Sequence, residues 1–174
     1  MYDFICMVTV ICELTKRCRE SVVDSGKGSA AVTLLAFRLL SNCFKQSGSA
    51  RAAIDCASTI ISLSIESINS SSKNVRLAIA TVLLNMSTVI SQKDEMFSES
   101  IANELINSLS LIFDDPAYTE NKTTAARALL ALGTILFAMR QKGLRSSHES
   151  KLGTVINNVE ESPLQKEVLD LLSV

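Results

Sequence analysis

The stretch Asn74-Val-Arg-Leu-Ala-Ile-Ala-Thr-Val-Leu-Leu-Asn-Met-Ser87 determines the fold that we expect for this chain. Eleven apolar residues lie between Val75 and Ile90, which is too dense for a helix with one solvated face and too long for a strand. On a helix the polar positions fall within a sector of about 60°; they are Asn74, Thr81, Asn85, Thr88 and Gln92. Such a helix is expected to form one layer in a stack of helices, with only its polar stripe facing water or a ligand.

Composition points to a single all-α domain over residues 1–174. Hydrophobic residues make up 47% of the chain and aromatic residues 5%, with no Trp and two Pro. This suits helices packed through Ala, Leu, Ile and Val, and lacks the aromatic and turn-rich content of a β-sandwich. Because the formal net charge is −1, we expect neither a nucleic acid nor a membrane as partner, and any basic site must be local.

The cysteines and the start of the chain indicate a compartment. Five cysteines lie in apolar patterns without a CxxC pair, which favours buried free thiols in a reducing compartment, the cytoplasm or nucleus, over disulfides or a metal site. Residues 1–14 are apolar enough to suggest a signal sequence, but Asp3 precedes the apolar run and no basic residue does. A core-facing helix is therefore the favoured reading, and no other segment is expected to approach membrane-span length.

Helical periodicity and turn residues predict the order of elements. Helices are expected at about 3–23, 29–46, 50–68, 74–92, 98–113, 122–140, 151–158 and 163–172. Gly48 and Gly143 are expected to end the second and sixth of these helices. Pro116 follows the end of the fifth, because proline cannot continue the hydrogen-bond ladder of a helix.

Three of these helices resemble one another in sequence. Leu-rich segments with a small or polar residue at one position surround Asn42, Asn85 and Thr134, at intervals of 43 and 49 residues. A helical unit that recurs at about 40–47 residues is typical of armadillo and HEAT repeats. The units are expected to stack into a curved solenoid whose inner groove is lined by one helix from each repeat.

The polar stripes of these three helices supply the candidate site. On each helix the polar or small residues fall within about 60° of one another, so they would share the groove. Asn offers a donor and an acceptor to a peptide backbone, and Arg can bind a carboxylate through two hydrogen bonds. The candidate peptide-binding residues are Arg38, Asn42, Lys45, Thr81, Asn85, Arg127 and Thr134.

A structural interpretation of the same residues stays open. Arg38 and Arg127 could pair with acids on neighbouring helices, and the asparagines could cap turns between helices. Arg76 points away from the stripe and is expected on the outer face. No catalytic residue, metal ligand set or cofactor is predicted, because the only histidine, His148, lies in a polar loop and Gly26-Lys27-Gly28-Ser29 lacks the Walker spacing.

Three motifs in this order resemble the PUL domain of the phospholipase-activating protein and its relatives. They are Leu35-Ala-Phe-Arg-Leu-Leu-Ser-Asn-Cys-Phe44, the stretch from Asn74 to Ser87, and Ala126-Arg-Ala-Leu-Leu-Ala-Leu-Gly-Thr-Ile135. The resemblance runs from about Val32 to the C-terminus. It implies an armadillo-like fold and a non-catalytic adaptor role in ubiquitin-dependent degradation, with ubiquitin bound only through other domains of a parent protein.

The resemblance also implies a partner, the acidic, aromatic-containing C-terminal tail of the valosin-containing AAA+ ATPase. Arg38 and Arg127 match family arginines that bind this tail, whereas a tail contact by Asn42 or Asn85 is inferred from the stripe alone. Family domains are longer at the N-terminus, so we expect this chain to be the C-terminal two-thirds of such a domain. The alternative function is a helical scaffold that self-associates, or binds another protein, through the helix at 3–23.

Overall fold

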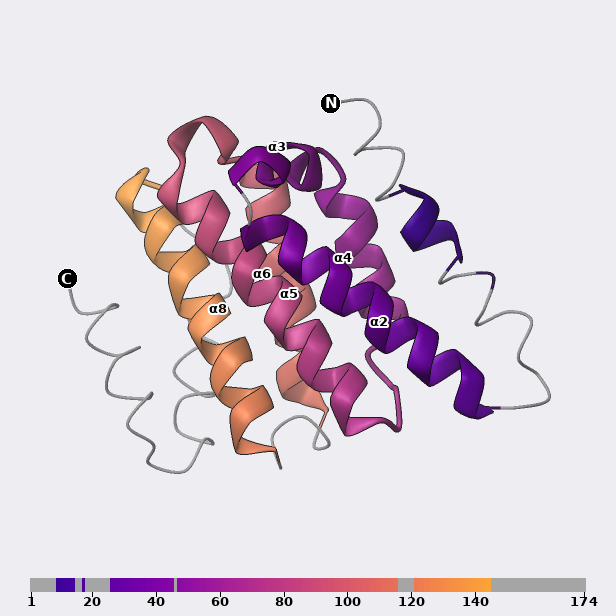
Figure 1. Cartoon of the computed structure of the whole chain (residues 1–174). Helices are drawn as coiled ribbons and strands as arrows, with labels where there is room; N and C mark the ends of the chain where they lie inside the picture. The colour runs from indigo at the N-terminus through magenta and orange to yellow at the C-terminus, as the bar shows by residue number, and fades with distance from the viewer. Residues whose placement is uncertain (1–8, 15–16, 18–25, 46, 116–120, 145–174) are drawn as a thin grey trace.

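The computed structural model describes residues 9–14, 17, 26–45, 47–115 and 121–144, and within these ranges all regular structure is helical (Figure 1). The elements are α2 (Gly26–Lys45), α3 (Ser47–Asp55), α4 (Ala57–Glu66), α5 (Lys73–Gln92), the 3-10 turn η1 (Asp94–Met96), α6 (Glu99–Asp114) and α8 (Lys122–Gln141). Residues 9–14 are also helical, and Cys12 among them is buried in the core. The all-α class is thereby confirmed.

The described helices form two layers. Helices α2, α5 and α8, each of 20 residues, lie side by side, with α5 packed between the other two. They are the three segments that resemble one another in sequence, and we call them the inner layer. Helices α4 and α6 lie behind them in Figure 1, and α3 lies at the top next to the end of α2. We call α3, α4 and α6 the outer layer, in which α4 packs on α6 and α6 packs on α8. This arrangement is compatible with a helical solenoid.

Helix α5 is the centre of the core. Its apolar side chains reach both neighbours in the inner layer and the outer layer behind, and Val75, Ile79, Leu83, Met86 and Ile90 are at most 1% exposed. The polar stripe of the same helix is left at the layer surface, where Thr81 and Asn85 are half-buried. The burial pattern thus agrees with a helix that is apolar nearly all round.

The ends of the helices are fixed by local chemistry. Ser98 accepts a hydrogen bond from the backbone N–H of Ile101 and begins α6, and Asn121 accepts one from the N–H of Thr124 at 3.1 Å and begins α8. Gly143 follows the last turn of α8 with φ of 71°, a left-handed conformation that favours glycine. Its predicted role as a helix stop is confirmed.

Two predicted boundaries are wrong. The single helix expected at 50–68 is divided at Cys56, whose φ of −104° and ψ of 11° leave the helical region, so α3 and α4 are separate. The apolar periodicity does not reveal this break between α3 and α4, because Ala53 before it and Ile60 after it are both buried in the same core. Gly48 does not end α2 but lies in the first turn of α3. The backbone N–H groups of a first turn have no acceptor within their own helix.

The expectation that only the start of the chain approaches membrane-span length also needs correction. By length and composition α5 and α8 could each cross a membrane. However, 50% of the apolar window of α5 and 61% of that of α8 are buried inside the protein, as in core helices that pass the same test. The helices predicted at 151–158 and 163–172, His148, and most of the segment at 3–23 lie outside the described residues.

Candidate functional site

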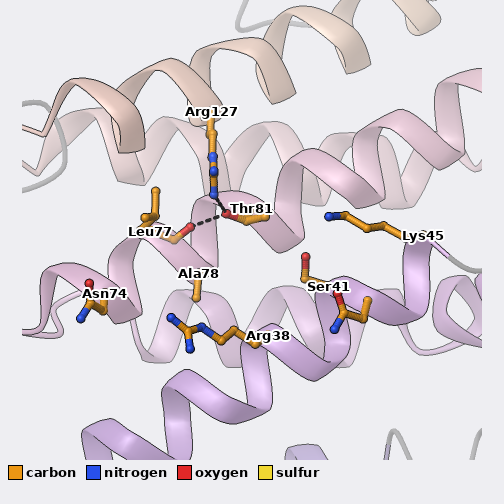
Figure 2. A pocket seen from close by; sticks show the side chains of 9 residues that line it. Arg38, Ser41, Lys45, Asn74, Leu77, Ala78, Thr81 and Arg127 are labelled. Atoms are coloured by element: carbon orange, nitrogen blue, oxygen red, sulfur yellow. Dashed lines mark hydrogen bonds between the residues drawn. The ribbon is translucent and has the colours of Figure 1, made fainter.

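A cavity of about 310 Å³ opens between the three helices of the inner layer (Figure 2). Helix α2 contributes four residues, α5 another four, and α8 a single arginine. The lining residues are Arg38, Ser41, Asn42, Lys45, Asn74, Leu77, Ala78, Thr81 and Arg127. We call this cavity the three-helix pocket.

The structure brings five of the seven sequence-predicted residues together around the pocket and places two elsewhere. Arg38, Asn42, Lys45, Thr81 and Arg127 line it. Asn85 instead donates from Nδ2 to the backbone oxygen of Ser41 at 3.1 Å and to its Oγ at 2.7 Å, so its amide joins α5 to α2. Thr134 donates to the carbonyl oxygen of Leu130 at 2.7 Å within its own helix and lies outside the lining.

Arg127 is held at the pocket by a neutral side chain. It reaches from α8 to α5, where its Nη1 donates to Oγ1 of Thr81 (Figure 2). Thr81 Oγ1 in turn donates to the carbonyl oxygen of Leu77 at 2.6 Å, a bond that serine and threonine commonly make within helices. The hydroxyl hydrogen is thereby engaged, and a lone pair is left to accept from the guanidinium. Because Thr81 carries no charge, it orients Arg127 without neutralising it.

The other two cations come from α2. Arg38 and Lys45 extend from this helix along the pocket (Figure 2). Both are exposed, as is Asn42, which lies between them in the sequence and also lines the pocket. Among the residues that the structure describes, no carboxylate pairs with Arg38, Lys45 or Arg127. The alternative interpretation, in which acids on adjacent helices neutralise Arg38 and Arg127, is therefore not supported by any ion pair within the described ranges.

Charge is divided sharply between the layers. The inner-layer helices α2, α5 and α8 contain eight basic residues and no Asp or Glu. The eight are Lys27, Arg38, Lys45, Lys73, Arg76, Lys122, Arg127 and Arg140. The outer-layer helices carry five acids and one arginine. In a chain of net charge −1 these three helices thus carry positive charge only, and Arg38, Lys45 and Arg127 of the eight line the pocket, where they attract anions.

Sequence reasoning missed two features of this site. Ser41, Asn74, Leu77 and Ala78 line the pocket but were not candidates, although Asn74 belongs to the predicted polar stripe. The charge division was also missed, and counting acids helix by helix would have found it. Arg76, expected on the outer face, is half-buried and donates from Nη1 to the carbonyl oxygen of Ser70 at 2.6 Å, so it fastens the loop before α5.

The described thiols are poorly suited to nucleophilic chemistry. Burial raises the pKa of the Cys43 thiol, and burial also raises the pKa of Cys56, so both thiols stay protonated at neutral pH. Cys12, Cys43 and Cys56 are buried and present as thiols. In the part of the chain that the structure describes, no group of three His, Cys, Asp or Glu side chains is placed to hold a metal ion.

A comparison with known protein families identifies the family of this chain. The family model of the PUL domain matches residues 7–171, nearly the whole chain. The chain belongs to the PUL domain family. No curated protein and no solved structure matches it. PUL domains are helical protein-interaction modules, so this PUL domain is a protein-binding module whose basic inner layer carries the three-helix pocket.

Proposed function

We propose that this PUL domain is a non-catalytic adaptor that binds the acidic C-terminal tail of the valosin-containing AAA+ ATPase in the three-helix pocket. The observation that carries the proposal is the group of three cations, Arg38, Lys45 and Arg127, which surround one cavity with no described carboxylate paired to any of them. An arginine side chain presents a planar fork of donors that matches a carboxylate. An acidic peptide supplies the anions that this group lacks.

The lining residues suggest how such a tail is held. Carboxylates of the tail meet the guanidinium groups of Arg38 and Arg127, and Lys45 adds a third positive charge. Asn42 and Asn74 each carry a donor and an acceptor, which suits the alternating N–H and C=O groups of an extended backbone. A volume of about 310 Å³ lies at the lower end of ligand pockets, enough for a few side chains of a short segment.

The proposal includes a cellular setting. Thiols buried in the core, such as those of Cys12, Cys43 and Cys56, are stable where glutathione keeps thiols reduced, so we place the module in the cytoplasm or nucleus. There it would link the ATPase to ubiquitin-dependent degradation, with ubiquitin bound by other domains of a longer protein.

A titration of the domain with a fluorescent acidic C-terminal peptide tests the proposal. Arg38→Glu and Arg127→Glu are each expected to weaken binding at least about tenfold, because a partner cation becomes a repelling anion. The matched control is Arg140→Glu, which makes the same charge change at the far end of α8, outside the pocket lining. Equal affinity in Arg38→Glu, Arg127→Glu and the control would show that the pocket is not the tail site.

One observation favours a second function, a helical scaffold that self-associates through its first helix. Val10 and Leu14 lie one turn apart and are 53% and 54% exposed, so they form an apolar edge on that helix. Sedimentation of the wild type and of Val10→Ser/Leu14→Ser at rising concentration tests this function. Association that the double substitution abolishes supports it, and a monomer at all concentrations excludes it.

A further inference from the structure

Ser41 is buried on α2, yet its hydroxyl hydrogen has no acceptor among the residues that the structure describes. The residue is 6% exposed and lines the three-helix pocket. Asn85 of α5 donates from Nδ2 to its Oγ at 2.7 Å and to its backbone oxygen at 3.1 Å. Because an amide nitrogen can only donate, the Oγ of Ser41 accepts in this contact, and its own hydrogen must be directed elsewhere.

Three other hydroxyl groups of the inner layer use their hydrogens within their own helices. Thr81, Thr88 and Thr134 each donate to the carbonyl oxygen four residues earlier, at 2.6, 2.9 and 2.7 Å. The corresponding acceptor for Ser41 is the carbonyl of Phe37, and no such bond occurs within the described ranges. Leaving a buried hydroxyl hydrogen without an acceptor costs free energy, and a ligand in the adjoining pocket can supply the acceptor.

Ser41 also lies between the two cations of α2. It follows Arg38 by three positions and precedes Lys45 by four, a spacing that places all three on one face of the helix. Figure 2 shows its hydroxyl pointing from α2 toward α5. A carboxylate attracted by these two cations therefore comes within reach of the hydroxyl of Ser41.

Resting on the proposed function, we propose that the hydroxyl of Ser41 donates a hydrogen bond to the carboxylate that Arg38 and Lys45 attract. Asn85 is the positioning residue for this contact, because its amide occupies the oxygen of Ser41 and leaves the hydrogen to face the pocket. The attraction of the cations differs little between one anionic group and another. A hydroxyl donor at a fixed place is directional, so it distinguishes one carboxylate of the peptide from the others by position.

A titration with an acidic peptide, and with variants in which each acidic residue in turn is Ala, tests the proposal. Ser41→Ala is expected to bind the unchanged peptide about tenfold more weakly than the wild type does, the scale of a hydrogen bond to a charged group. This difference is expected to vanish at one acidic position only, where the carboxylate that Ser41 contacts has been removed. Asn85→Ala is expected to show the same position-specific loss, and the double variant no larger one, because both substitutions remove a single contact.

Ser87→Ala is the matched control. Ser87 is a fully buried serine on α5 whose Oγ also has no described partner, and it lies outside the pocket lining. This variant is expected to bind every peptide as the wild type does. Equal weakening in Ser87→Ala and Ser41→Ala would show a general effect of removing a buried hydroxyl and would overturn the inference.

The other outcomes separate this inference from the proposed function. If the wild type does not bind the peptide, the proposed function fails and the inference with it. If Ser41→Ala binds as tightly as the wild type, or is weakened equally for every peptide variant, the pocket stands as an acidic-peptide site and the role of Ser41 is overturned. A position-specific loss in Ser41→Ala that is absent from Asn85→Ala overturns the positioning role of Asn85.

Discussion

The two layers of this domain are built from similar apolar cores but treat charge in opposite ways. The outer layer contains an ion pair, Arg51 with Asp55 at 3.4 Å within α3, and Lys142, directly after α8, pairs with Asp94 of η1 at 2.7 Å. The inner layer has no acid on any of its three helices. Apolar burial is thus sufficient to form both layers, and the distribution of charge is what distinguishes the binding face from the supporting one.

Hydroxyl groups of both layers bond within their own helices, as Ser110 does to the carbonyl oxygen of Ile106 on α6 and Thr134 to that of Leu130 on α8. The inner layer has polar bonds between helices in addition: Thr81 accepts from Arg127 on α8, and Asn85 donates to Ser41 on α2. These bonds fix the positions of the helices around the pocket. The inner layer is therefore preorganised for a ligand, which reduces the entropy lost on binding.

The largest effect on stability is expected from a core substitution on α5, because both layers pack against this helix. Leu83 is fully buried on α5, and Leu83→Ala is expected to lower the free energy of unfolding by about 2–5 kcal/mol through lost burial and a residual cavity. Leu111→Ala, at an exposed position on α6, should change it by no more than about 0.5 kcal/mol. Urea denaturation measures both. Equal losses in the two variants would contradict the central place of α5.

Replacing the amide of Asn42 by a carboxylate introduces a negative charge into the all-basic inner layer. Asn42→Asp has nearly the same shape but places a carboxylate among the pocket cations, where it would compete with an acidic ligand. We expect about tenfold weaker binding of an acidic peptide, on the scale of coupling between close charges. Asn69→Asp, at an exposed loop position outside the pocket lining, makes the same change as a control. Isothermal calorimetry on both variants gives the comparison, and a weakened control would point to a general charge effect.

A smaller effect is expected from the contact that orients Arg127. Thr81→Val keeps the shape of the side chain but removes the acceptor, so the guanidinium is no longer fixed at the pocket. Peptide affinity should fall about threefold, the scale of one modest hydrogen bond. Thr81→Ser restores the hydroxyl and should restore the affinity. If valine and serine behave alike, the hydroxyl does not position Arg127 for binding.

The smallest effect belongs to the charged contact outside the inner layer. The hydrogen bond from Lys142 lowers the pKa of Asp94 from its ordinary value of 3.8. A carboxyl with a depressed pKa in the folded state stabilises the fold above its unfolded pKa, and this contribution is lost as the pH falls through the folded pKa. Because Asp94 is fully exposed, Asp94→Asn should lower the melting temperature only slightly at pH 7, and the difference should shrink as the pH falls below 3.8. A difference that grows on acidification would contradict this linkage.

Helical periodicity was enough to predict much of this arrangement. The 100° step places Arg38, Asn42 and Lys45 on one side of α2, and the structure puts all three along one pocket with Thr81 and Arg127. The side chain that would meet Asn85 could not be predicted, because it depends on how α2 packs against α5. Periodicity of a single helix does not contain this information.

Local hydrogen bonds and backbone conformation also decided features that the sequence pattern does not predict. Thr134 has the right angular position on α8, yet its hydroxyl bonds to the carbonyl of Leu130. The bend at Cys56 interrupts no apolar periodicity, since the residues before and after it share one core. Sequence thus predicted which helices face the pocket, and tertiary packing decided which of their side chains line it.

The most direct test is capture of the valosin-containing ATPase by the purified domain, with the ATPase either intact or deprived of its C-terminal tail. The account predicts that the wild-type domain captures the intact ATPase and loses it when the tail is removed, whereas Arg127→Glu captures neither form. Equal capture of the intact and clipped ATPase by the wild-type domain would contradict binding of an acidic tail in the three-helix pocket.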